Sequence, residues 1–287
     1  MNTNKILIKT NTKNYSIIIG RDLIGKIDEI LKANHLKFDK CLIVTDKNIP
    51  QKFKRILYKK LKINKLFKIE IKASEKNKNY RTIEKIHTVL FENRFNREDC
   101  VISFGGGIIG DIVGFASSTF KRGMKYVNIP TTLLAQVDSA VGGKTGVNSK
   151  HGKNLIGSYY QPNLVICDLS FLNSLPKRQV TNGYAEILKH AIISDKEFFN
   201  WLQKHSHKIL KNNHYSAYEI SNFSKMNKIL DEYKGSEEIK LKALIEIFES
   251  LKSLKIPIDI IAAGIDAEIV IPAYKPKYVI ADDKTID

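Results

Sequence analysis

Residues 100–111 read CVISFGGGIIGD, an apolar run that passes directly into a glycine-rich turn. Residues 100–104 are typical of a buried strand, and the apolar residues from Ile109 onward predict a helix. We expect the three adjacent glycines to reach positive φ and to leave no Cβ between the backbone and a ligand. A helix that starts in such a turn points its N–H groups at a phosphate or pyrophosphate. The alternative is a tight turn that only packs the helix against the strand.

The same glycines match a pattern found in dinucleotide-binding turns. Gly105, Gly107 and Gly110 have the G-x-G-x-x-G spacing,. That pattern alone is weak, and its usual companion is an acidic residue about 20 positions on. Residues 128–136 contain no carboxylate. The turn therefore favours an anionic ligand without identifying it.

The residues after this turn gather polar groups in a short, glycine-rich span. Residues 133–141 are too apolar to lie in water, which argues against the alternative of a solvated polar loop,. The hydroxyls, carboxylate, ammonium groups and amide suit an anionic, hydroxylated substrate that lies beside a nucleotide. They belong to Thr131, Thr132, Asp138, Lys144, Lys153 and Asn154.

Strand and helix patterns alternate up to about residue 168 and become helical after residue 175. The alternation predicts an α/β fold, in which a mainly parallel sheet forms a dinucleotide-binding domain over residues 1–170. A shortened all-helical domain is expected over residues 171–287. The expected strands are residues 5–10, 15–19, 41–45, 67–71, 100–104, 126–129 and 164–168, and the expected helices include 23–33, 50–60, 80–93 and 182–193.

The helix expected at 182–193 carries three functional side chains on one face. Glu186, Lys189 and His190 have i, i+3 and i+4 spacing, so they form either a surface ion cluster or a site,. Ser194 and Glu197 have the spacing of a capping box for a further helix,.

Composition excludes several classes of protein. The net charge is +17, but only seven of the 47 basic residues are Arg and the lysines are scattered, so no nucleic-acid partner is expected,. No uncharged stretch of 18 residues occurs, which predicts no membrane span,. Cys41, Cys100 and Cys167 lie in or beside apolar runs and predict buried, reduced thiols in a cytoplasmic protein,.

Long strings of the sequence resemble 3-dehydroquinate synthase, a family of sugar-phosphate cyclases. They are GGGIIGDIVGF, IPTTLLAQVDSAVGGKTGVN, GKNLIGSYYQP and LPKRQVTNGYAEILKHAII, and the resemblance extends over about residues 6–200. It implies an NAD-dependent lyase of the shikimate pathway of aromatic amino-acid biosynthesis. That enzyme converts 3-deoxy-D-arabino-heptulosonate 7-phosphate to 3-dehydroquinate and releases phosphate. Other sugar-phosphate cyclases, metal-dependent alcohol or glycerol dehydrogenases, and a non-catalytic NAD-binding remnant are the alternatives.

The resemblance also implies the residues of the site. Asp46 could instead cap the helix expected at 50–60, and Glu75 and Lys78 could instead belong to a solvated loop. The implied substrate contacts are Asp138, Lys144, Asn154 and Lys189, with Arg122 reaching the phosphate of a neighbouring subunit in a homodimer. The implied NAD contacts are Asp46, Asn48, Ser74, Glu75, Lys78, Gly106, Gly107, Ile108, Ile109, Gly110, Asp111, Thr131, Thr132, Lys144, Lys153 and Ser174.

The implied metal site is incomplete. Glu186 matches the first ligand of a divalent metal, zinc or cobalt, but the family's G-H-x-x-G-H and H-G-E stretches are absent from the sequence. The metal-histidine region of the family therefore looks deleted or replaced. His190, and less plausibly His205 or His207, could substitute for the missing ligands, although a histidine on a helix is more often packed or solvated. With Glu186 alone, we expect weak zinc binding and slow turnover.

Overall fold

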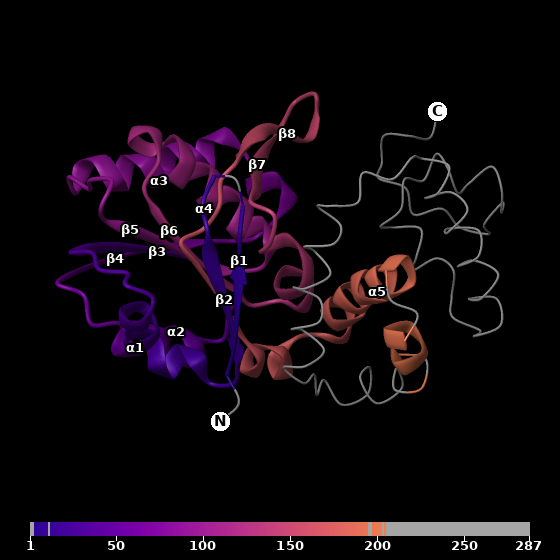
Figure 1. The fold of residues 1–287 in the computed structure, drawn as a ribbon. Coiled ribbons are helices and arrows are strands. Elements are labelled where there is room, and N and C mark those ends of the chain that lie inside the picture. The colour runs from indigo at the N-terminus through magenta and orange to yellow at the C-terminus, as the bar shows by residue number, and fades with distance from the viewer. Residues whose placement is uncertain (1–2, 11, 195–196, 203, 205–287) are drawn as a thin grey trace.

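The computed structural model describes residues 3–10, 12–194, 197–202 and 204. Seven strands form one sheet in the order β1-β2-β9-β6-β5-β3-β4, and only the β1–β2 pair is antiparallel (Figure 1). The predicted α/β fold with a mainly parallel sheet is confirmed. The strands are β1 (Asn4–Ile8), β2 (Tyr15–Gly20), β3 (Lys40–Asp46), β4 (Lys65–Ile71), β5 (Cys100–Gly105), β6 (Lys125–Pro130) and β9 (Leu164–Asp168).

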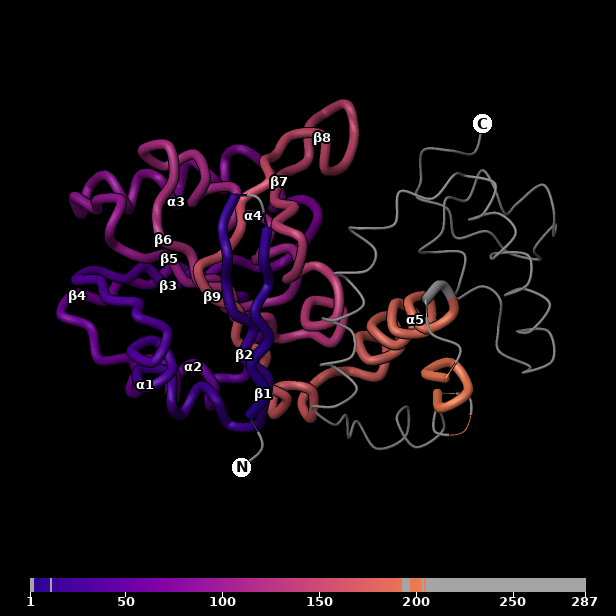
Figure 2. Tube along the Cα trace, viewed as in Figure 1, coloured from indigo at the N-terminus to yellow at the C-terminus, as the bar shows by residue number. Residues whose placement is uncertain are grey.

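The central strands are mostly apolar because helices cover both faces of the sheet,. Side chains alternate along β3, so Ile43 packs into the core on one face and Leu42 and Val44 pack into the core on the other,. The 3-10 turn η1 (Leu23–Lys26), α1 (Ile27–Ala33) and α2 (Gln51–Lys60) cover the first face. The second face is covered by α3 (Tyr80–Glu92) and α4 (Gly107–Thr119), as Figure 2 also shows.

A two-stranded hairpin that the sequence did not predict extends beyond these layers. It pairs β7 (Lys144–Ser149) with β8 (Gly152–Tyr159) (Figure 1). The two strands approach so closely that a Cβ on Gly157 would lie 2.0 Å from the carbonyl oxygen of Thr145. Glycines weaken a strand pattern, which explains why the hairpin was missed.

The helix after the sheet shares a core with it. The helix α5 (Lys177–Ser194) begins earlier than expected and packs Tyr184, Ile187 and Ala191 against Ile17 of β2 and Val165 of β9. The part of residues 171–204 that is described is helical except at short turns. The domain boundary near residue 170 stays a prediction. The capping box lies partly outside the described residues, and His205 and His207 lie wholly outside them.

The prediction that the cysteines are buried is confirmed. Cys41, Cys100 and Cys167 are buried and form no disulfide. None of the described helices has the length and apolar character needed to cross a membrane.

A buried carboxylate ties the end of β9 to the start of η1. Asp168 is fully buried and accepts hydrogen bonds from the backbone N–H groups of Asp22 at 2.9 Å, Ile24 at 3.0 Å and Ser170 at 3.0 Å. An ionised carboxylate can accept on both oxygens, which an amide cannot do. This interaction positions the loop after β2 beside the strand end.

Asp168→Asn is predicted to destabilise the fold by about 1–3 kcal/mol, because one amide N–H₂ would face a backbone donor. Urea unfolding would measure the loss. The matched control is Asp28→Asn, which removes a surface pair with Lys32 and should change stability by less than about 1 kcal/mol,. Equal stability of the two variants would contradict the role of Asp168.

Candidate functional site

The sheet topology identifies one edge as the place for a ligand. Strands β3 and β5 are parallel neighbours, but β3 leads into α2 on one face and β5 leads into α4 on the other. In open α/β sheets, ligands bind beyond the carboxyl ends of strands where the connections diverge in this way. The glycine turn of residues 105–107 and the loop after Asp46 both lie at this point.

The turn at residues 105–107 requires glycine because neighbouring side chains pack directly against its backbone. A Cβ on Gly105 would lie 2.6 Å from the side chain of Ile109, and a Cβ on Gly107 would lie 2.7 Å from Ser139 Oγ. None of residues 105–107 has positive φ, so the expectation of left-handed glycines here is wrong. Gly106 is the extended N-cap of α4, and its carbonyl accepts the N–H groups of Ile109 and Gly110. The N-terminal turn of α4, which contains Ile108, faces the strand ends.

Asp46 joins the loops that follow β3 and β4. Its Oδ1 accepts the backbone N–H of Asn48 at 3.1 Å and that of Ala73 at 3.2 Å. The N-cap of α2 is Pro50, with no side-chain hydrogen bond, so the helix-capping alternative for Asp46 is wrong. Asn48 is exposed, and Ser74 precedes the short turn η2 (Glu75–Asn77).

A buried lysine connects three elements beside the turn. Lys78 is only 5% exposed, and its Nζ donates to Asp111 Oδ2 of α4 at 2.5 Å and to Asn154 Oδ1 of β8. Its carbonyl oxygen accepts the N–H of Asn148 at 2.8 Å, and the side chain of Asn148 donates to the carboxylate of Glu75 at 2.7 Å. The solvated-loop alternative is therefore wrong for Lys78. Asn148, which the sequence analysis missed, fastens the hairpin to this loop.

Burial and a neighbouring charge shift the pKa of the Asp111 carboxyl group in opposite directions. Burial raises its pKa, and the ammonium of Lys78 opposes that rise. The ammonium of Lys78 therefore favours the ionised form of this buried carboxyl,.

Residues that follow β6 lie at the same edge of the sheet as the glycine turn. The Thr131 N–H donates to the Gly105 carbonyl at 2.9 Å, and Thr132 Oγ1 accepts the N–H of Ala135 at 3.2 Å. A π-type turn, η4 (Ala135–Ser139), follows and carries Asp138. The buried hydroxyl oxygen of Ser139 has no hydrogen-bond partner within the described part of the chain. The sequence analysis did not identify Ser139, because its contact with Gly107 depends on the folded structure.

Asp138 meets the functional face of α5. Potential ligand atoms of Asp138, Glu186 and His190 all lie within 4.8 Å of one another, and Lys189 Nζ donates to Glu186 Oε1. The close approach depends on Gly183, where a Cβ would lie 2.5 Å from Leu133 Cγ. The structure thus brings together residues that are far apart in the sequence.

Burial and neighbouring charges of both signs shift the pKa values of Asp138 and His190. The pKa of Asp138 is raised, first by burial and then by the Glu186 carboxylate, while Lys189 and Lys144 oppose the rise. The pKa of His190 is lowered by burial and by Lys189, against the effect of Glu186. Two carboxylates and a neutral imidazole are a donor set that suits a divalent cation such as zinc or cobalt.

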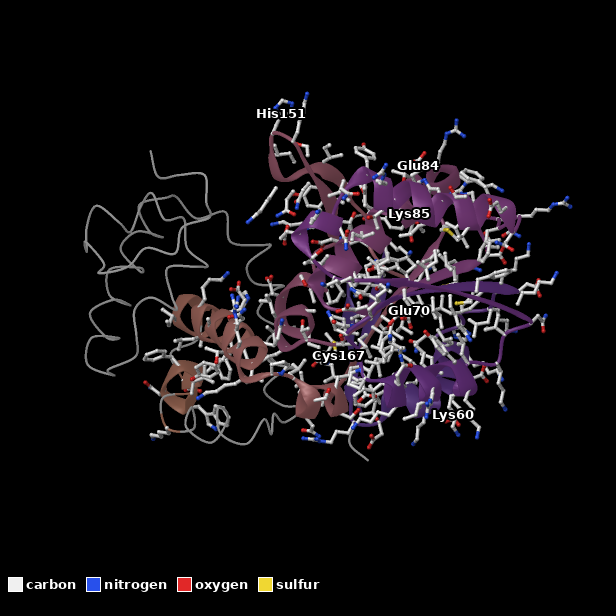
Figure 3. All side chains as sticks on the ribbon, turned by 180° about the vertical axis from the view of Figure 1, so that it is seen from behind. Lys60, Glu70, Glu84, Lys85, His151 and Cys167 are labelled. Carbon is white, nitrogen blue, oxygen red and sulfur yellow. The ribbon has the colours of Figure 1, made fainter. Side chains whose placement is uncertain are left out.

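Other predicted site residues are exposed and make none of the contacts described above, although Lys144 acts electrostatically on Asp138. Lys144 and Lys153 are exposed on the hairpin, whose tip at His151 points away from the sheet (Figure 3). Ser174 is exposed, and its hydroxyl donates to the Phe171 carbonyl. Arg122 is exposed at the end of α4 opposite the glycine turn, about 20 Å away along the helix,.

Comparison with known proteins agrees with this geometry. The family model described as 3-dehydroquinate synthase N-terminal matches residues 68–182. The 3-dehydroquinate synthase of Pelagibacter ubique is 55% identical over 207 residues, which are 72% of this chain and 56% of that protein. The 3-dehydroquinate synthase of Prochlorococcus marinus subsp. pastoris is 40% identical over 251 residues, 85% of this chain and 69% of that protein. The chain thus spans little more than half the length of the Pelagibacter relative.

Solved structures of related cyclases share the fold. The 2-epi-5-epi-valiolone synthase of Streptomyces hygroscopicus, with NAD⁺ and Zn²⁺ bound, has a TM-score of 0.68 and 28% identity, with 79% of this chain and 63% of that chain covered. A 2-deoxy-scyllo-inosose synthase complexed with carbaglucose-6-phosphate, NAD⁺ and Co²⁺ has a TM-score of 0.60 and 25% identity, with 66% and 51% covered.

The fold and the strand-end geometry define an α/β protein of the class that includes dinucleotide-binding cyclases and dehydrogenases. The match to the Prochlorococcus marinus subsp. pastoris enzyme, which covers 69% of that protein at 40% identity, identifies the family within this class. The chain belongs to the 3-dehydroquinate synthase family.

Lys78→Met is predicted to cost stability that depends on pH. The buried carboxyl of Asp111 keeps the burial that raises its pKa and loses the ammonium that lowers it, so its pKa rises further. The folded chain then holds a proton that the unfolded chain releases, and stability falls as pH rises above the ordinary value of 3.8,. We expect a loss of about 1–3 kcal/mol at pH 7 and less at pH 4, measured by urea unfolding.

Lys76→Met is the matched control, because Lys76 is exposed in the same loop. It should be nearly neutral at both pH values. If the Lys78 variant lost the same amount of stability at pH 4 and at pH 7, the apolar part of the Lys78 side chain, and not its charge, would account for the loss.

Proposed function

We propose that the chain is a 3-dehydroquinate synthase, which converts 3-deoxy-D-arabino-heptulosonate 7-phosphate to 3-dehydroquinate and phosphate with NAD. The observation that carries the proposal is the convergence, at one sheet edge, of the glycine turn, the Lys78 network and the cluster of Asp138, Glu186 and His190. Family membership supports this reaction over that of other cyclases or dehydrogenases. A remnant that only binds NAD is an outcome that the tests below would reveal.

The strand-end residues fit a dinucleotide. The tight turn at residues 105–107 and the first N–H groups of α4 would hold the pyrophosphate,. Asp46 and Asn48 at the end of β3 would lie beside the adenosine, and Thr131 and Thr132 would line the turn on the side of β6. NAD supplies the hydride acceptor and then the hydride donor of the reaction. Glu75, Asp111, Lys153 and Ser174 belong to the proposed NAD site by family resemblance.

The polar residues of η4, α5 and the hairpin fit the sugar-acid phosphate. Lys144, Lys189 and Asn154 would bind its anionic and hydroxyl groups. Asp138 would accept the hydrogen of a substrate hydroxyl. Binding of the substrate across these elements would exclude water from the reacting atoms.

Glu186 would hold a divalent metal, zinc or cobalt, which would polarise the hydroxyl that is oxidised. Arg122 lies too far along α4 to serve its own site, which supports a role toward the phosphate in a second subunit of a homodimer. The three buried thiols, which form no disulfide, support a reducing compartment and thus the cytoplasm,.

Gly107→Val is predicted to weaken NAD binding by at least about tenfold, or about 1.4 kcal/mol, because the side chain would enter the turn and meet Ser139,. Isothermal titration with NAD would measure it, with circular dichroism to establish that the variant is folded. The control is Gly25→Ala, since a Cβ there meets nothing within 4 Å. Unchanged affinity in a folded Gly107 variant would place NAD elsewhere.

Lys144→Met is predicted to lower kcat/KM for phosphate release by roughly 10- to 150-fold, the effect of losing about 1.5–3 kcal/mol of charge-assisted binding. The assay uses 3-deoxy-D-arabino-heptulosonate 7-phosphate and detects inorganic phosphate. Lys150→Met, at an exposed position of the same hairpin, is the control and should retain the parent rate. If the parent chain binds NAD and releases no phosphate, it is instead a non-catalytic NAD-binding remnant.

A further inference from the structure

Three potential metal ligands meet at α5: Glu186 and His190, which the sequence analysis considered, and Asp138, which it did not consider as a metal ligand. Glu186 and His190 are one helical turn apart, so both side chains lie on the same face of the helix,. The π-type turn η4 brings Asp138 to that face from about 50 residues earlier in the chain. The three potential ligand atoms lie within 4.8 Å of one another.

We propose that Asp138, Glu186 and His190 together bind a divalent metal, zinc or cobalt. The inference rests on the proposed function, because it supplies the metal that the reaction needs. It requires no donor from the residues after 204.

The distances suit such a site after small side-chain movements. Three ligand atoms at about 2.1 Å from one ion, in tetrahedral arrangement, lie about 3.4 Å apart. The separations of up to 4.8 Å therefore close by rotations of the two carboxylates and the imidazole. Three protein ligands with a fourth position open to substrate are the usual arrangement of catalytic zinc sites.

The charges also fit a dication. Two carboxylates that share a buried location repel each other, and a doubly charged ion neutralises both. Lys189 partly fills this role through its contact with Glu186 Oε1, and Glu186 Oε2 can still coordinate. Lys189 therefore competes with the metal for the same carboxylate.

His190 is suited to coordination by its location. Its side chain is 4% exposed, and its ring lies near the two carboxylates. An imidazole nitrogen is a common zinc ligand, and the ring shares this buried location with the two carboxylates,. Asp138 can bind the ion through one oxygen and a substrate hydroxyl through the other.

The test is a titration of the full chain, purified without a chelating tag, with Co²⁺ followed by visible d–d absorption and with Zn²⁺ by calorimetry. We expect one ion per chain and a spectrum of low coordination number. Asp138→Asn, Glu186→Gln and His190→Gln should each weaken binding by about 100-fold or more. All three substitutions keep side-chain size, and circular dichroism establishes that each variant is folded.

Two matched variants sharpen the result. His151→Ala removes an exposed histidine at the hairpin tip and should leave the affinity and spectrum unchanged (Figure 3). Lys189→Met should bind Co²⁺ several-fold more tightly, because the competing ammonium is gone. Parental affinity and spectrum in folded Asp138→Asn and His190→Gln variants would overturn the proposal, as would weaker binding by Lys189→Met.

NAD titration separates this inference from the function on which it rests. If the parent binds NAD and no metal, the three-residue site is wrong and the NAD half of the function stands. If it binds metal through these residues and no NAD, the metal site stands and the proposed function fails.

Discussion

The close approach of α4 to the ends of β5 and β6 depends on the absence of side chains at residues 105–107. Ile109, Thr132 and Ser139 occupy the space that Cβ atoms on these glycines would need. The helix therefore starts directly at the sheet edge, and its N-terminus lies where the paths from β3 and β5 diverge. Every other group of the candidate site is arranged around this starting point.

Two connections extend the site outward from the turn. The ammonium of Lys78 links α4 to the β7–β8 hairpin through Asp111 and Asn154. On the other side, η4 carries Asp138 to α5, where it meets Glu186 and His190. One connection lies beside the proposed cofactor position and the other at the proposed metal, so the substrate would bind between groups that belong to a single packed structure.

The sequence predicts the parallel strands well because apolar runs such as residues 41–45 and 100–104 are buried on both faces. It does not predict the hairpin, because Gly146 and Gly157 interrupt the strand pattern of the sequence. These glycines allow the two backbones to approach closely. It also assigns the glycine turn to positive φ, whereas the structure uses glycine for its small size. Spacing predicts that Glu186 and His190 share one face of the helix. It does not predict that Asp138 meets them, because that contact depends on how Gly183 packs α5 against Leu133.

The shared core of α5 and the sheet affects how the chain can be divided. Val180, Tyr184 and Leu188 cover Ile17, Ile19 and Val165, which would otherwise face water. A fragment that stopped near residue 170 would present this apolar surface to solvent, and such surfaces promote self-association. Residues 1–170 alone would therefore expose an apolar surface, and α5 belongs to the same folding unit as the sheet.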